Sequence, residues 1–354
     1  MGKRTFDIDW LVFIPTVILV CLGLAVLLSI DASFFYQQIL SAVIGLALFL
    51  LFARIDFSIY HYIDRWLFIG CIVFLLLSYL GPNVRGATRW LDLGPFRFQP
   101  SEFVKPFFLL SISSFMIRYR PEKIKHILLH IGLFLIIFLL IFKQPDLGSS
   151  LVYLAMWVGL IVLAGIPLRY IIGTVLTISI ATPAGFKLLH DYQKLRILTF
   201  LNPVLDPQGA GYNAIQSMIA VGSGKLFGRG FGRGTQSILQ FLPERHTDFV
   251  FASFTESFGF VGAAVLLAVF FILFTHLLTQ ANERKVNQVA FLYISGFFIQ
   301  LFTHVVINIG MNMGILPITG ITLPFISYGR SSFLAICIGL GIYISAIQRP
   351  RSFE

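Results

Sequence analysis

Two acids, an arginine and a histidine fall within five positions of this sequence, immediately before a long apolar segment. The stretch from Phe241 to Phe249 reads Phe-Leu-Pro-Glu-Arg-His-Thr-Asp-Phe. Charged groups at a membrane boundary are costly unless they are used, and a carboxylate there can accept a proton from a reacting hydroxyl. Asp248 is therefore the candidate catalytic residue, and His246 is the rival base.

Aspartate is also a favoured helix N-cap, and the next apolar segment begins at Asp248. From the residues alone the cap and the base explain Asp248 equally well, because acids in clefts mark functional sites only statistically. Glu256, about two turns into the segment, is a third candidate base. Four neighbours of Asp248 are candidate substrate-binding residues: Glu244, Arg245, His246 and Thr247.

The elements that position these residues are expected to be membrane-spanning helices. The 354 residues are 57% hydrophobic and 12% charged, about half the roughly 25% of a soluble domain. The mean hydropathy is +0.87. The apolar runs are continuous and do not alternate with period two, which favours helices over a barrel. We predict an all-α polytopic integral membrane protein, one domain over 1–354, in contact with membrane lipids and not with nucleic acid.

Ten transmembrane helices are expected, the first of them a retained span and not a signal peptide. One large hydrophilic insertion, 188–249, separates the seventh and eighth. The three cysteines, all inside apolar runs, suggest neither disulfides nor a zinc site. The expected spans are 10–30, 36–53, 66–81, 101–117, 127–142, 150–165, 169–187, 250–278, 288–309 and 326–347.

Lysine and arginine in the short loops predict the orientation. With the N-terminus inside, 13 of the 26 cations lie on the inner side, and 7 of the remaining 13 fall in the long insertion or directly before it, at Lys187. Long loops cross largely regardless of charge, so the comparison is 13 against 6. Both termini are therefore expected in the cytoplasm and the insertion outside. The outer cations favour an anionic ligand such as a lipid diphosphate; the alternative is that they neutralise nearby acids.

Further polar motifs lie at the ends of other spans. Arg89 and Trp90 precede Gln-Pro-Ser-Glu-Phe-Val-Lys, in which Glu102 and Lys105 share one helix face. That pair predicts an ion pair that steadies the helix end, a charged face toward a polar cavity, or both. Asp146, in Gln-Pro-Asp-Leu-Gly-Ser, is interpreted as a helix cap.

The insertion carries Arg196, then Gln216 and Ser217, then a glycine-rich stretch over 222–234. That stretch lacks the Lys-Ser or Lys-Thr of a nucleotide-binding loop, and a flexible cationic loop over the membrane surface is expected instead. Prolines and glycines over 308–332 predict a broken or re-entrant segment beside the active groove, because irregular backbone at membrane depth lines cavities.

These motifs, in this order, resemble the SEDS family (shape, elongation, division and sporulation), which includes the RodA and FtsW branches. The resemblance covers nearly the whole chain. It rests on the Arg-Trp and Gln-Pro-Ser-Glu-x-x-Lys segment, Gln-Pro-Asp-Leu-Gly-Ser, the Gly-Tyr and Gln-Ser pair, Leu-Pro-Glu-x-His-Thr-Asp-Phe, and the Pro-x-Thr-Gly to Ser-Tyr-Gly ending with Ser327. Three positions depart from the family pattern: Lys225, Ser257 and Arg330.

The resemblance implies a ten-helix fold that polymerises lipid II into glycan strands at the outer face of the bacterial cytoplasmic membrane. It implies that Asp248 is the essential acid and that a class B penicillin-binding protein is the partner. The motif Leu-Pro-Glu-Arg-His is closer to the RodA elongation branch, although Arg-Ile-Leu-Thr-Phe-Leu-Asn-Pro, which begins at Arg196, is also close to FtsW.

The expected reaction is an inverting displacement of undecaprenyl diphosphate, with Asp248 as general base. Cations among Arg89, Lys105, Arg196 and Arg245 would stabilise the diphosphate, and Glu102 would position Lys105. Mg²⁺ or Mn²⁺ could assist, but no ligand cluster requires either, so no cofactor is assigned. The competing hypotheses are a lipid II flippase and a purely structural partner of a transpeptidase.

Overall fold

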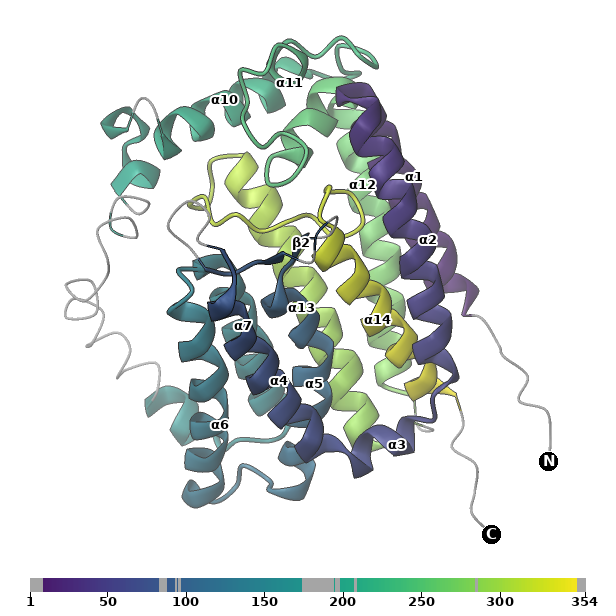
Figure 1. Cartoon of the computed structure of the whole chain (residues 1–354), viewed down its shortest axis with the longest axis vertical. Coiled ribbons are helices and arrows are strands. Elements are labelled where there is room, and N and C mark those ends of the chain that lie inside the picture. The colour runs from purple at the N-terminus through teal and green to yellow at the C-terminus, as the bar shows by residue number, and fades with distance from the viewer. Residues whose placement is uncertain are drawn as a thin grey trace.

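The computed structural model shows a bundle of helices that is capped at one end by shorter helices (Figure 1). The all-α prediction is confirmed, since the described strands are only β1 (Leu91–Asp92) and β2 (Arg97–Phe98), a short antiparallel pair. The structure describes residues 9–82, 88–92, 94, 97–173, 194, 198–206, 209–283 and 286–348.

Nine of the ten predicted spans coincide with helices of the described chain, and the seventh, 169–187, lies mostly outside it. Six of these helices are long and apolar enough to cross a membrane: α1, α2, α6, α12, α13 and α14. The helices are α1 (Trp10–Ile30), α2 (Ala32–Arg54), α3 (Phe57–Tyr62), α4 (Asp64–Leu77), α5 (Pro100–Arg118), α6 (Ile124–Phe142), α7 (Leu147–Leu163), α10 (Ala210–Ser223), α11 (Thr235–Ile238), α12 (Val250–Ala281), α13 (Gln288–Asn312) and α14 (Arg330–Ile347), with 3₁₀ turns η1 (Ser78–Leu80) and η2 (Pro203–Leu205).

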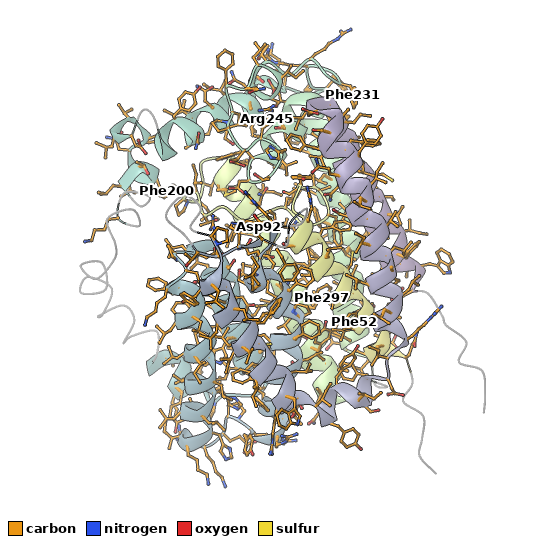
Figure 2. The ribbon with its side chains drawn as sticks, in the orientation of Figure 1. Phe52, Asp92, Phe200, Phe231, Arg245 and Phe297 are labelled. Atoms are coloured by element: carbon orange, nitrogen blue, oxygen red, sulfur yellow. The ribbon has the colours of Figure 1, made fainter. Side chains whose placement is uncertain are left out.

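Several helices begin or end with polar residues at the same end of the bundle. Asp31 ends α1 and caps α2, where its Oδ1 accepts a hydrogen bond from the Ser33 amide at 2.7 Å. Pro100 opens α5, a position where its missing N–H costs nothing. Figure 2 shows Arg245 and Asp92 toward this end, above Phe297 and Phe52 of the bundle. The polar motifs of the sequence therefore gather at one end.

The described part of the insertion is packed onto this end of the bundle. Helix α10 contacts α12 and α13, and α11 contacts α12. In Figure 1 both lie across the end of the bundle that carries the polar motifs. The opposite end is closed by Asp9, whose Oδ2 accepts hydrogen bonds from His276 Nε2 at 2.7 Å and from the Tyr343 hydroxyl at 2.8 Å.

Helix α12 is broken at Gly259, where φ is 68° and ψ is −165°. The glycine-rich loop lies against this break: Lys225 O accepts the Phe260 amide at 2.8 Å, and a Cβ at Gly228 would lie 2.1 Å from Ser257 O. The close approach explains why glycine is needed there. The expected flexible loop is thus wrong for this part of the stretch, because backbone hydrogen bonds fix it to the break.

The chain between α13 and α14 is irregular and mostly buried from residue 321 to residue 327, which confirms the predicted broken segment. Ile321, Leu323 and Ile326 are at most 4% exposed. The Ser327 hydroxyl donates to Thr247 O and accepts a hydrogen bond from the Leu323 amide at 2.8 Å. This turn delays the last helix, so α14 begins at Arg330 and not at the predicted 326.

Candidate functional site

The segment before α12 forms a tight turn anchored at both sides by apolar residues. Leu242 and Phe249 are at most 2% exposed and pack with Ala220 and Ala252. Between them Glu244 has a φ of 51°, and its carbonyl accepts the Phe249 amide at 3.2 Å. The turn leaves 244–248 only partly buried. The polar side chains are thus presented by a fixed backbone.

Asp248 lies just before the start of α12, partly buried. The N-cap of α12 is Phe249, whose own side chain makes no capping hydrogen bond, and Asp248 lies one position before it. The capping alternative for Asp248 is therefore not what the structure shows. Its carbonyl accepts hydrogen bonds from Asn308 at 2.8 Å and Asn312 at 3.0 Å. A Cβ added to Gly320 would lie 3.4 Å from its Oδ2, which puts the carboxylate beside the broken segment.

His246, the rival base, is held by ring stacking. Its ring lies on that of Phe34 with centroids 4.0 Å apart and an interplanar angle of 9°, and Tyr328 is 5.6 Å away. The Tyr328 amide donates to His246 O at 2.8 Å. Burial lowers the pKa of His246, and the carboxylate of Glu244 opposes that shift only in part. The imidazole is therefore neutral at pH 7.

This shift predicts a pH dependence of stability. Because the pKa of His246 is lower in the folded protein than in the unfolded chain, its contribution is complete above the unfolded pKa, about 6.5. It is lost as the pH falls through the folded value. We expect His246→Phe, which keeps a ring on Phe34, to destabilise less at pH 5 than at pH 7.5 relative to wild type. Melting temperatures in detergent test this, and a pH-independent difference contradicts it.

Arg245 lies near Asp31 at the turn between α1 and α2. Hydrogen bonds from Ser33 lower the pKa of Asp31, and the charge of Arg245 adds a smaller contribution in the same direction. The Arg245 carbonyl accepts from the Ser253 hydroxyl at 3.1 Å. The Arg245 guanidinium thus lies at the same end of the bundle as Asp248, near the carboxylate of Asp31.

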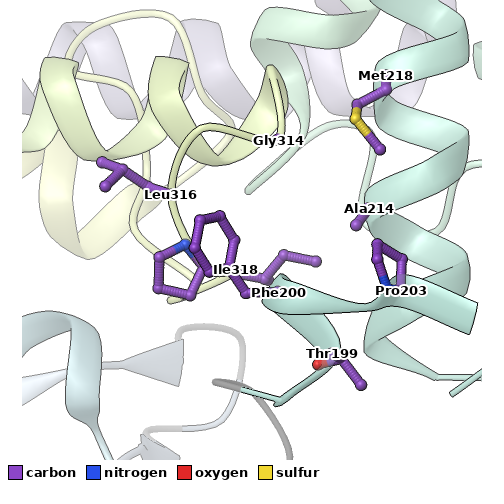
Figure 3. A pocket seen from close by; sticks show the side chains of 9 residues that line it. Thr199, Phe200, Pro203, Ala214, Met218, Gly314, Leu316 and Ile318 are labelled. Carbon is purple, nitrogen blue, oxygen red and sulfur yellow. The ribbon is translucent and has the colours of Figure 1, made fainter. Parts of the chain in front are cut away.

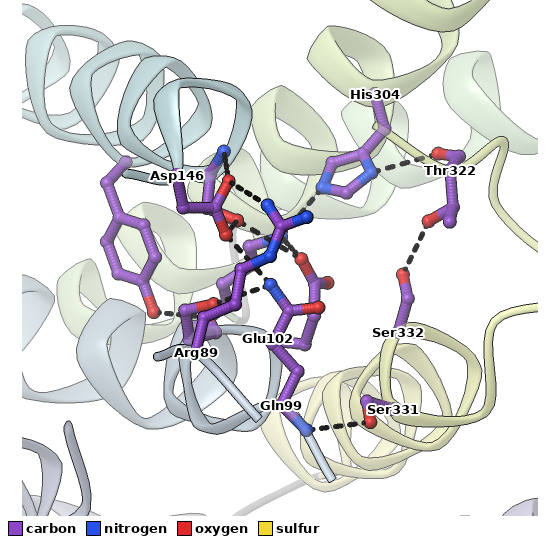
Figure 4. A network of polar contacts seen from close by, with 12 residues as sticks. Arg89, Gln99, Glu102, Asp146, His304, Thr322, Ser331 and Ser332 are labelled. Carbon is purple, nitrogen blue, oxygen red and sulfur yellow. Dashed lines mark hydrogen bonds and ion pairs between the residues drawn. The ribbon is translucent and has the colours of Figure 1, made fainter. Parts of the chain in front are cut away.

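The second cluster lies around the start of α5 (Figure 4). The predicted ion pair is confirmed: Lys105 Nζ lies 2.6 Å from Glu102 Oε1. Lys105 is 0% exposed and Glu102 8%, so the ammonium does not face an open groove. Its other neighbour is His304 Nε2 at 3.0 Å. Of the two interpretations, the structure therefore supports the internal ion pair.

Asp146 caps α7, as predicted, by accepting the Ser149 amide at 3.0 Å. Its Oδ2 also accepts from Gln99 Nε2 at 2.8 Å, and Arg89 Nη1 lies 3.9 Å from its Oδ1. The Arg89 side chain remains 35% exposed. Trp90, its neighbour, is partly buried. Arg89 is thus an accessible cation tied to the second cluster.

Of four other candidate residues, two lie on α10, one lies in the broken segment and one is outside the described residues. Ser217 is buried and donates to Asn312 O at 2.9 Å, while Gln216 beside it is partly buried. The Ser327 hydroxyl donates to Thr247 O at 2.7 Å. Arg196 lies outside the described residues.

Glu256, the third candidate base, holds helix α11, which follows the glycine-rich stretch. Its carboxylate accepts from the Gln236 amide at 2.9 Å, the Ser237 amide at 3.0 Å and the Ser237 hydroxyl at 2.6 Å. It is 0% exposed. Both oxygens are therefore engaged in structural hydrogen bonds, and Glu256 is not the base.

The three departures from the family pattern lie at ordered positions, and one of them, Arg330, makes contacts through its side chain. Lys225 lies at a φ of 48° and uses its carbonyl to bond the break in α12. Ser257 likewise offers its carbonyl to the Gly230 amide at 3.2 Å. The Arg330 guanidinium donates to Gln37 Oε1 and to the Tyr328 hydroxyl. It therefore ties the start of α14 to α2.

Three residues of α13 belong to the site although the motifs did not reveal them. His304, Asn308 and Asn312 contact Lys105, Asp248 and the broken segment. Their signal was visible, because polar side chains four residues apart in an apolar span share one face and are functional by default.

An apolar pocket lies next to this region (Figure 3). One wall, Ile318, also packs on the cluster that contains Phe249. Apolar pockets with few polar groups are typical of sites for hydrophobic ligands. The lining residues are Thr199, Phe200, Pro203, Ala214, Met218, Gly314, Leu316, Pro317 and Ile318.

The sequence matches the family FTSW_RODA_SPOVE, described as "Cell cycle protein", over residues 8–352. "Peptidoglycan glycosyltransferase MrdB" of Escherichia coli (strain K12) is 38% identical over 355 residues, which cover 97% of this chain and 95% of the relative.

Solved structures are similar over the same length. The structure described as "Structural coordination of polymerization and crosslinking by a peptidoglycan synthase complex" has a TM-score of 0.84 at 29% identity and covers 97% of this chain and 98% of that chain. The crystal structure of the rod shape determining protein RodA of Thermus thermophilus has a TM-score of 0.75 at 27% identity and covers 99% of both chains.

Proposed function

Because the chain belongs to the FtsW, RodA and SpoVE family over nearly its whole length, we propose that it is a peptidoglycan glycosyltransferase that polymerises lipid II. The observation that carries the proposal is the position of Asp248. Its carboxylate lies beside Gly320 of the broken segment, and its backbone carbonyl accepts hydrogen bonds from the buried side-chain amides of Asn308 and Asn312. Such a carboxylate suits a general base.

The reaction follows from the chemistry of the substrate. The acceptor sugar hydroxyl attacks the anomeric carbon of the donor, the bond to undecaprenyl diphosphate breaks, and its electron pair leaves with the diphosphate. Asp248 accepts the hydroxyl proton as the new bond forms. Diphosphate leaves without protonation, so one carboxylate suffices where a glycosidase uses two. A single displacement inverts the anomeric centre.

Arginine side chains at the same end of the bundle as Asp248 stabilise the leaving diphosphate. Arg245 and the 35% exposed Arg89 supply paired donors that match phosphate geometry. Arg196 remains a candidate for the same role. Lys105 acts through its field, because its ammonium is fully buried in the pair with Glu102. The remaining candidate contacts with lipid II are Trp90, Gln216, Ser217, Glu244, His246, Thr247 and Ser327.

A divalent cation remains an additional candidate. Among the described residues, no group of three or more His, Cys, Asp or Glu side chains could hold a metal ion. Mg²⁺ or Mn²⁺ would therefore take most of its ligands from the substrate diphosphate. No step above is routed through a metal.

The flippase hypothesis is less well supported than polymerisation. It requires a charged or polar path from the site to the inner face, and α5 below Lys105 offers only the small hydroxyls of Ser111, Ser113 and Ser114 among buried apolar residues such as Phe108, Leu109 and Ile112. The next charged side chain on α5 is Arg118 in its last turn, which pairs with Asp64 of α4 at 2.8 Å. A purely structural role would leave Asp248 dispensable.

The chain is a multi-pass membrane protein, and we propose that it lies in the bacterial cytoplasmic membrane with both termini in the cytoplasm. The site then faces outward, where lipid-linked precursors are polymerised. A class B penicillin-binding protein is the proposed partner, supported by the similarity to a peptidoglycan synthase complex, and cell elongation is the proposed process.

Vesicles that contain the purified protein, its partner transpeptidase and fluorescent lipid II separate the hypotheses. A polymerase converts accessible lipid II into glycan strands and releases undecaprenyl diphosphate. A flippase instead moves intact lipid II between leaflets without strand formation, and that result contradicts the proposal.

A further inference from the structure

Helix α13 presents a line of buried polar side chains toward Asp248. His304, Asn308 and Asn312 follow one another at intervals of four, so they share one face of the helix. They are 1%, 0% and 0% exposed. Buried amides are costly unless their hydrogen bonds are made, so their partners indicate what they are for.

The two asparagines hold the backbone on both sides of the site. Asn308 Nδ2 donates to Asp248 O at 2.8 Å and to Ile321 O at 2.7 Å. Asn312 Nδ2 donates to Asp248 O at 3.0 Å. One amide thus joins the catalytic segment to the broken segment, although the two are far apart in sequence. The gap between Asp248 and 320–321 is therefore set by Asn308.

The orientation of the Asn312 amide is fixed by a third element. Its Oδ1 accepts the Ala252 amide at 3.0 Å in the first turn of α12. Since the oxygen must face that donor, the NH₂ group must face Asp248. The Asn312 side chain therefore holds the main chain at two points, Asp248 just before α12 and Ala252 in its first turn.

His304 extends the line to the buried ion pair (Figure 4). The Lys105 ammonium has only donors, so His304 Nε2 accepts from it at 3.0 Å. The hydrogen of the neutral ring is then on Nδ1, which donates to Thr322 O at 3.2 Å. His304 and Asn308 thus hold consecutive carbonyls of the broken segment, at Thr322 and Ile321.

We infer that Asn308 is a positioning residue for the reaction, acting with Asn312 and His304 to fix the Asp248 carboxylate relative to the 320–322 backbone. This inference rests on the proposed function. Asn308 has no role in proton transfer. It determines the position of the Asp248 carboxylate. A misplacement of about 1 Å in such a constellation can cost about 10²-fold in rate.

Asn308→Leu tests the inference because its side chain branches at the same atom as that of asparagine and removes both donated bonds. We expect kcat for strand synthesis to fall about 10²-fold, with KM for lipid II little changed, because the lost interaction is not with the substrate. Gln300→Leu is the matched control: it lies two turns away on the same face, is 1% exposed, and its Oε1 has no hydrogen-bond partner among the described residues. It should keep wild-type kcat.

If Asn308→Leu does not fold, Asn308→Ala replaces it, since alanine removes both donors without adding volume and should lower kcat to a similar degree. Wild-type kcat in a folded Asn308 variant overturns the inference, as does a loss that appears only in KM.

Hydrogen–deuterium exchange provides a readout that does not need activity. Asn308→Leu should accelerate exchange of the amides at 249–252 and 321–323 and leave those of α14 unchanged. Unchanged exchange at both segments overturns the inference even if the wild-type protein makes no polymer. The absence of polymer from wild type would instead contradict the proposed function.

Discussion

Replacing Asp248 with asparagine is expected to lower kcat for glycan polymerisation by about 10²–10⁴-fold, the usual contribution of a general base. Asparagine has the same shape and keeps the carbonyl that Asn308 and Asn312 hold, so the change removes basicity and little else. The rate of undecaprenyl diphosphate release from lipid II measures the effect, in the presence of the partner transpeptidase.

Asp92→Asn is the matched control for this prediction. Asp92 lies at the same end of the protein and pairs with Arg97 at 3.6 Å on the surface (Figure 2). An exposed pair of this kind contributes about 0–1 kcal/mol, so its loss should leave kcat unchanged. If Asp248→Asn polymerises as fast as wild type, Asp248 is not the base and His246 becomes the remaining candidate in the turn.

Glu102→Gln is expected to destabilise the protein by about 3–5 kcal/mol, because it leaves a buried ammonium without its counter-charge. Lys105 is 0% exposed, and its other neighbour is the neutral His304, which cannot balance the charge. The fall in melting temperature in detergent, measured by intrinsic fluorescence, reports the loss.

The double variant Glu102→Gln with Lys105→Met separates the buried charge from general damage to packing. Replacing both members of a buried pair by neutral side chains of similar volume is often nearly neutral, so the double variant should melt above Glu102→Gln alone. If the fall in melting temperature of the double variant equals the sum of the falls for Glu102→Gln and Lys105→Met, the two side chains are not coupled electrostatically.

Much of the fold was predictable because apolar length and turn residues act locally. The spans, the cap at Asp146 and the ion pair between Glu102 and Lys105 depend on residues close in sequence, where helical spacing determines contact. The start of α14 was missed by four residues because the turn closed by Ser327 competes with helix.

The parts of the site that were missed depend on contacts between distant segments. Spacing alone places Asn308 and Asn312 on one face of a helix. It does not predict that their partner is Asp248, about sixty positions earlier. The glycine-rich loop was expected to be flexible because nothing in its residues predicts a break at Gly259 for its carbonyls to bond. Glu256 was a candidate base on sequence alone, because nothing near it in the sequence predicts that its carboxylate binds the amides of α11.

Strand synthesis from purified lipid II by the detergent-solubilised protein and its partner, with Asp248→Ala assayed beside wild type, tests the central claim most directly. The account predicts polymer from wild type and none from Asp248→Ala, with lipid II binding retained by both. Polymer of equal length and yield from Asp248→Ala would contradict the assignment of the base.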